Sequence, residues 1–84
     1  MKFSERNTLI DTATQRFKSL HDSFTRGTKI LTDDEWNEYI SSMDKVAGDY
    51  RDTNISGITG AICMAFLDDT EMVQKKLRGN DYGH

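Results

Sequence analysis

The sequence predicts an all-α protein, a small bundle of three principal helices over about residues 4–26, 32–50 and 55–78. Three observations support this fold class. Apolar residues recur at helical spacing in all three segments, glycines and polar stretches lie between the segments, and the chain contains no proline. With 84 residues, the chain is expected to form a single helical domain, 1–84, in which 80–84 is a flexible tail.

The first segment carries one apolar stripe. Four large apolar residues stand seven positions apart and two more fill the offset positions: Phe3, Ile10, Phe17, Phe24, then Ala13 and Leu20. This spacing places all six on one side of a helix, which therefore needs a packing partner. Ser4 is the expected N-cap, and Gly27 is the expected left-handed residue that ends the helix.

The second segment has the clearest local signal in the chain. Thr32 and Glu35 have the spacing of a capping box, and Leu31 and Trp36 have that of a hydrophobic staple, so a helix should begin at Thr32. The apolar residues that follow repeat every three or four positions: Trp36, Tyr39, Ile40, Met43, Val46, Ala47 and Tyr50. Gly48 leaves two interpretations open, an early end of the helix or close packing against a neighbour.

The third segment is the most apolar, and its pattern continues to Leu77, with Gly79 as the expected stop. Four small residues at helical spacing, Gly57, Gly60, Ala61 and Ala65, favour tight packing in the core, with a dimer contact as the alternative. Asp68 and Glu71 are spaced as a second cap. A short fourth helix from about residue 70 is therefore the alternative to one long helix.

Composition limits the class of protein. No run approaches the roughly 18 apolar residues of a membrane span, and the polar start lacks the apolar core of a signal peptide, so we expect a cytoplasmic protein without a membrane segment. The net charge of −3 argues against a dedicated nucleic-acid binder. The single cysteine, Cys63, lies among apolar residues and is expected to be buried.

The sequence contains no recognisable catalytic, metal or cofactor motif. The two histidines, His21 and His84, are far apart and form no zinc-type cluster with Cys63. His21 as a phosphate acceptor is the weaker interpretation, because an exposed histidine beside an apolar stripe is common. The glycines of residues 56–60 lack the lysine of a phosphate-binding loop. We therefore predict a protein that is not an enzyme and binds no cofactor or metal.

Acidic residues remain as candidate recognition features. The candidate protein-interaction residues are Asp33, Asp34 and Glu38 in the second segment and Asp68 and Asp69 in the third. Carboxylates in a first helical turn are stabilised by the helix dipole, which explains most of the first group without a partner. The pair in the third segment is less fully explained.

Two functional hypotheses follow. The first is a small acidic, noncatalytic protein that binds a protein partner or itself, as a homodimer, and serves as an adaptor, regulator or inhibitor. The second is a helical nucleic-acid-binding regulator that uses the basic residues Lys75, Lys76 and Arg78, or Arg16 and Lys18. The negative net charge and the apolar start of the third segment weigh against the second hypothesis.

Overall fold

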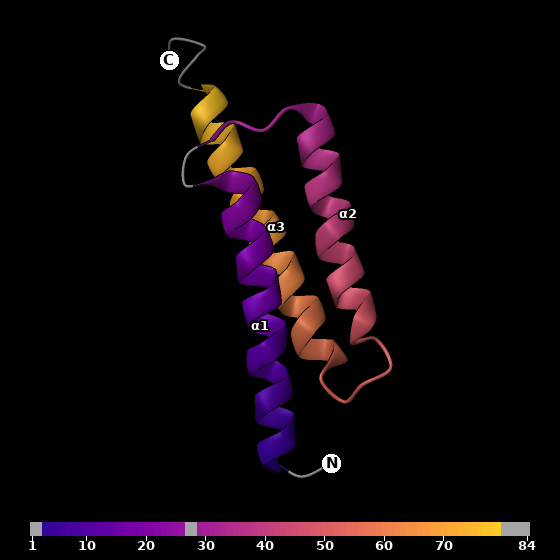
Figure 1. Cartoon of the computed structure of the whole chain (residues 1–84). Helices are drawn as coiled ribbons and strands as arrows, with labels where there is room; N and C mark the ends of the chain where they lie inside the picture. Colours follow the sequence, from indigo (N-terminus) through magenta and orange to yellow (C-terminus); the bar gives the residue numbers. More distant parts are fainter. Residues whose placement is uncertain (1–2, 27–28, 80–84) are drawn as a thin grey trace.

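The computed structural model describes residues 3–26 and 29–79, which form three α-helices: α1 (Phe3–Thr25), α2 (Asp33–Asp49) and α3 (Ser56–Gly79). α1 and α3 run in the same direction and α2 runs against both (Figure 1). Each helix contacts the other two. The predicted all-α bundle of three helices is therefore confirmed.

The core lies along the line where the three helices meet. Phe17 of α1 and Tyr39 of α2 are fully buried at its centre, and Cys63 of α3 is buried as predicted. Of the predicted α1 stripe, Ala13 and Phe17 are buried, whereas Ile10, Leu20 and Phe24 pack against the core from its edge. The side chain of Phe3 lies outside the described part of the structure.

The start of α2 has the predicted capping box. The Thr32 hydroxyl accepts the backbone N–H of Glu35 at 3.1 Å, and a carboxylate oxygen of Glu35 accepts the backbone N–H of Thr32 at 3.0 Å. Leu31 is buried and Trp36 packs against the same core, in agreement with the predicted staple. The helix continues through Gly48 and ends at Asp49, with Tyr50 as C-cap, so Gly48 does not end it.

The start of α1 differs from the prediction. Ser4 is not the N-cap, because it lies inside α1, where its carbonyl accepts the Thr8 hydroxyl. Gly27 lies outside the described residues. The left-handed position that precedes it is Arg26, which has a φ of 40° and whose N–H bonds the Asp22 carbonyl at 3.0 Å.

α3 is one unbroken helix, so the alternative of a short fourth helix from about residue 70 is wrong. Asp68 and Asp69 are exposed to solvent, and α3 continues through them. The residues before and after them that face the core are anchored by their contacts. Phe66 packs against the core, and Thr70 and Gln74 are buried in polar contacts with other elements. The predicted tail, 80–84, lies outside the described residues.

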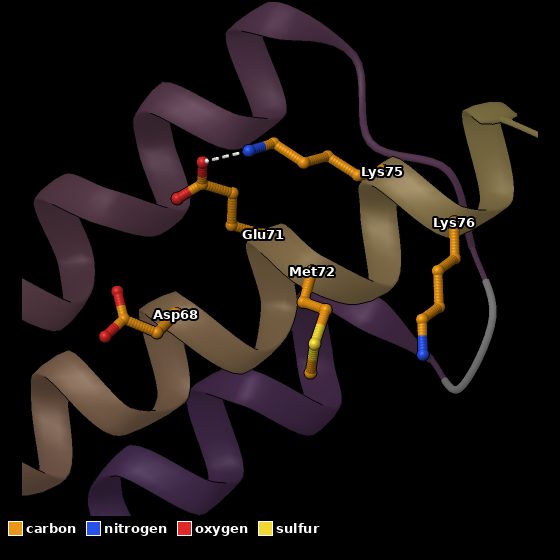
Figure 2. A pocket seen from close by; sticks show the side chains of 5 residues that line it. All are labelled: Asp68, Glu71, Met72, Lys75 and Lys76. Atoms are coloured by element: carbon orange, nitrogen blue, oxygen red, sulfur yellow. Dashed lines mark ion pairs between the residues drawn. The ribbon is translucent and has the colours of Figure 1, made fainter.

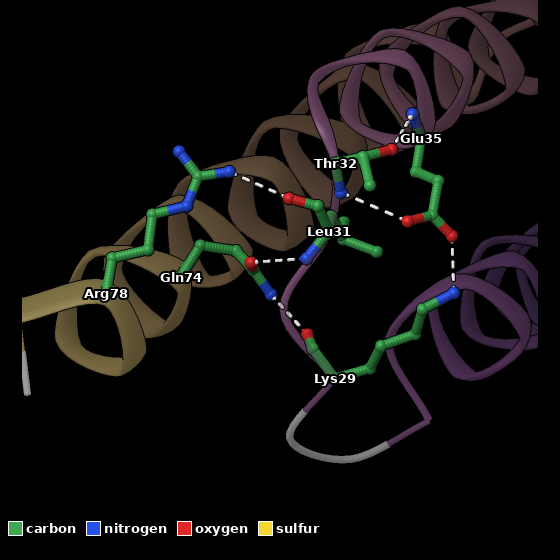
Figure 3. Close-up of polar contacts among 6 residues, drawn as sticks. All are labelled: Lys29, Leu31, Thr32, Glu35, Gln74 and Arg78. Carbon is green, nitrogen blue, oxygen red and sulfur yellow. Dashed lines mark hydrogen bonds and ion pairs between the residues drawn. The ribbon is translucent and has the colours of Figure 1, made fainter. Parts of the chain in front are cut away.

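The end of α3 holds the connection between α1 and α2 through Gln74 and Arg78 (Figure 3). The side-chain carbonyl of Gln74 accepts the N–H of Leu31 at 2.9 Å, and its amide group donates to the carbonyl of Lys29 at 2.8 Å. Arg78 donates to the carbonyl of Leu31 at 2.7 Å. These bonds fix the rotation of α3 about its axis, and with it the side of α3 that faces solvent.

Candidate interaction surface

The side of α3 turned away from α1 and α2 forms a continuous exposed surface. We call it the outer face and define it by six exposed residues: Ala61, Met64, Ala65, Asp68, Met72 and Lys76. Met64 and Met72 are the largest apolar side chains on it and are 56% and 51% exposed. The inward positions of the same helix carry Thr59, Cys63, Thr70 and Gln74. α3 is thus amphipathic, yet its outer face is not purely polar.

Among the small residues of α3, Gly57, Ala61 and Ala65 are exposed and Gly60 is half-buried, which corrects the prediction of tight core packing. A side-chain carbon added at Gly57 or at Gly60 would meet no atom within 4 Å. The core instead packs on larger residues of α3, such as Ile62, Phe66 and Leu67.

Opposite charges flank Met72 on the outer face (Figure 2). Asp68 lies one turn before Met72 and Lys76 lies one turn after it, and all three line a shallow hollow of about 460 Å³. Glu71 and Lys75, which line the same hollow, form an ion pair with each other at 3.1 Å. Asp68 and Lys76 are too far apart along the helix to pair in this way, because they stand eight residues apart.

The predicted acidic residues fall into two separate groups. Asp68 and Asp69 are exposed on α3, and Asp33, Asp34 and Glu38 are exposed on the first turns of α2. Asp33 lines a groove of about 380 Å³ between α2 and α3, to which Glu71 and Lys75 also contribute. The structure therefore brings Asp33 near the end of α3 and does not gather the five carboxylates into one site.

Glu35, next to the α2 group, is engaged within the chain. It forms an ion pair with Lys29 and closes the capping box with Thr32. The Lys29 ammonium group, followed by the Thr32 N–H, lowers the pKa of Glu35 from its ordinary value of 4.5 to about 2. This carboxylate stabilises the local fold.

The groups with nucleophilic or acid–base chemistry are used in packing. His21 is part-buried rather than exposed as expected, and its ring lies 5.0 Å from that of Phe66, with its Nδ1 atom 3.5 Å from Asp22. Burial, followed by the charge of Asp44, raises the pKa of the Cys63 thiol and favours its neutral form. The described residues show no hydrogen bond between His21 and Cys63, and nothing arranges them as a nucleophile and its base.

Residues 3–26 and 29–79 contain no group of three histidine, cysteine or carboxylate side chains that could hold a metal ion. Every buried side-chain nitrogen and oxygen in these ranges has a hydrogen-bond partner. None of the three helices combines the length and the apolar run that a bilayer span requires.

Sequence reasoning missed the outer face as a surface. The helical spacing of α3 already separates two sides. Asp68 and Met72 lie on one side, and the other side carries Cys63, Phe66, Thr70 and Gln74. Comparison of the chain with protein-family models, with curated proteins and with solved structures finds no match.

Proposed function

We propose that the protein is a small noncatalytic helical protein that acts through protein–protein interaction, as an adaptor, regulator or inhibitor, and that the outer face of α3 is its contact surface. The observation that carries this proposal is the exposure of Met64 and Met72 on one side of a single helix. Methionine is flexible and polarisable, and it is favoured at surfaces that bind other proteins.

The setting of these methionines supports the proposal. Ala61 and Ala65 lie beside them and would let a second backbone approach closely. Asp68, Asp69 and Lys76 provide the charged border that is typical of a protein interface. The carboxylates of α2, Asp33, Asp34 and Glu38, lie on another helix and remain a separate prediction. We further propose the cytoplasm as its location, where a lone buried thiol needs no oxidising compartment.

The test compares two double variants with the same change of charge. Met64→Lys with Met72→Lys places two charges on the outer face, and Asn37→Lys with Ser41→Lys places two on exposed positions of α2. Each tagged protein is exposed to a lysate of the source cells with and without nuclease, and retained proteins are quantified together with self-association of the bait.

We expect the wild type and the α2 variant to bind a protein in stoichiometric amounts, whether or not nuclease is added. The bound protein is either another protein or a second copy of the chain. The outer-face variant should lose at least about tenfold of this binding, as expected when an apolar contact of an interface is replaced by charge. Equal binding by both variants, or no protein binding by the wild type, would overturn the proposal. Nuclease-sensitive retention would favour the nucleic-acid hypothesis instead.

A further inference from the structure

We propose that the partner of the outer face is a second copy of this chain, which packs its α3 antiparallel to the first about a two-fold axis at Met72. This inference rests on the proposed function and gives it a specific partner and register. The order of the charged and apolar residues along α3, their exposure, and the open space beside Gly79 support it.

The charges of the outer face are self-complementary in this arrangement. With Met72 on the axis, each residue before it lies opposite the residue equally far after it in the other copy. Asp68 then faces the partner's Lys76. Symmetry repeats this pair, so two ion pairs flank a central contact between two methionines. Asp68 and Lys76 are both exposed.

Two alternative arrangements oppose like charges. A parallel pairing of the two helices would place Asp68 against the partner's Asp68 and Lys76 against the partner's Lys76. An antiparallel pairing with its axis one turn earlier would place Met64 against the partner's Met72, but it would also put Asp68 on the axis against its own copy. Like charges in direct opposition disfavour both arrangements. The charge order therefore favours the axis at Met72 over these two arrangements.

The residues at the ends of the contact allow two helices to come close. Ala65 lies opposite the partner's Gly79 in this register, and a side-chain carbon added at Gly79 would meet no atom within 4 Å. The stretch from Ala65 to Gly79 is about 21 Å long in a helix. A contact of this length lies at the small end of protein interfaces, so we expect reversible association in the micromolar range or weaker.

Exchange of the charges tests both the partner and the register. Sedimentation equilibrium of the purified full chain from about 10 μM to about 1 mM covers the range in which such an interface dissociates. Asp68→Lys alone and Lys76→Asp alone each replace two attractive pairs by two repulsive ones and should weaken the dimer about tenfold or more. The double variant restores complementarity and should return the dissociation constant to within about threefold of wild type, since the pairs are only reversed.

Several results would overturn this inference. These are a wild type that stays monomeric up to the highest concentration, single variants that associate as well as the wild type, or a double variant that does not recover. Because both positions are exposed, all variants should keep the helical circular dichroism spectrum of the wild type. Asp11→Lys, an exposed carboxylate on α1, is the matched control and should leave association unchanged.

The two proposals can fail separately. A monomeric wild type that still binds another protein through Met64 and Met72 would remove the self-association and keep the proposed function. A wild type that associates with the predicted charge dependence, but loses no association in the Met64→Lys, Met72→Lys variant, would contradict both, because Met72 lies at the centre of the proposed contact.

Discussion

Gln74 and Leu31, 43 residues apart in the sequence, are joined by a buried hydrogen bond of 2.9 Å from the Leu31 N–H to the Gln74 side chain. The same side chain donates to the Lys29 carbonyl at 2.8 Å. One glutamine thus serves two backbone groups of the connection that leads into α2. This relationship ties the end of α3 to the capping box at Thr32, because Leu31 directly precedes the cap.

Replacement of Gln74 by leucine should destabilise the protein by about 2 kcal/mol or more, because a buried N–H and a carbonyl lose their partner at once. The change is measured as the shift of the urea midpoint at constant slope. Gln15→Leu, at an exposed position of α1, is the control and should change stability by less than about 0.5 kcal/mol. Equal effects of the two substitutions would show that the Gln74 bonds contribute no net stability.

The capping box should make stability depend on pH in the acid range. The pKa of Glu35 is lowered from 4.5 to about 2 in the folded protein. Its contribution is therefore complete above about pH 4.5, falls as the pH decreases, and is absent below about pH 2. Glu35→Gln keeps a carbonyl oxygen for the Thr32 N–H but removes the ion pair with Lys29.

The measurement compares urea midpoints of wild type and Glu35→Gln from pH 7 to pH 2. Wild type should be the more stable protein at pH 7, and the two should converge as the pH approaches 2. Glu38→Gln, at an exposed position on the same helix, controls for general loss of negative charge. A difference that stays constant across the range would mean that the charge of Glu35 has no part in its effect.

The fold could be predicted from the sequence because its local signals agree. These signals depend on residues close in sequence. They are the Thr32 capping box, the apolar spacing around Phe17, and the apolar repeat every three or four positions from Tyr39 to Tyr50. The structure confirms each of them. The end of α1 was harder to predict, because nothing in the sequence indicates that Arg26, and not a glycine, takes a left-handed conformation.

The candidate site was harder to predict, for a physical reason. Whether a small residue lies in a core or on a surface depends on how a helix is rotated against its neighbours. In α3 that rotation is fixed by contacts distant in sequence, such as Tyr39 with Thr70 and Leu31 with Gln74. Spacing alone therefore identified a stripe that includes Gly60 and Ala65 but could not tell which way it faces.

The buried hydroxyl pair of Tyr39 and Thr70 should show energetic coupling. Their oxygens lie 3.0 Å apart, and the Thr70 hydroxyl also lies 2.7 Å from the Phe66 carbonyl, to which it donates. Tyr39 therefore donates to Thr70. Burial, opposed by this hydrogen bond, raises the pKa of Tyr39 and keeps it neutral. Tyr39→Phe should cost about 1 kcal/mol.

A double-mutant cycle with Thr70→Val measures this coupling. Thr70→Val alone leaves the Tyr39 hydroxyl buried without its acceptor and should cost more than Tyr39→Phe. The double variant should cost less than the sum of the two, by about 0.5 kcal/mol or more. Strict additivity in thermal or urea unfolding would show that the two hydroxyls do not interact.

The left-handed backbone at Arg26 predicts that glycine is more stable than alanine at this position. With a φ of 40°, any residue with a side-chain carbon is strained there, and glycine is not. Arg26→Gly should be more stable than Arg26→Ala by about 0.5 to 1 kcal/mol, after allowance for the greater freedom of glycine in the unfolded chain. Both variants lose the arginine side chain, so their difference isolates the backbone. A more stable alanine variant would contradict the conformation at this position.

Gly48 should behave in the opposite way, because it lies inside α2 without a conformation that requires glycine. A side-chain carbon added there would lie 3.7 Å from a terminal nitrogen of Arg51, which is an ordinary contact. Gly48→Ala should therefore stabilise the protein by up to about 1 kcal/mol through helix propensity. Ser41→Ala, at an exposed position of the same helix, should give a smaller gain. A loss of stability in Gly48→Ala would contradict an unobstructed helical backbone at this position.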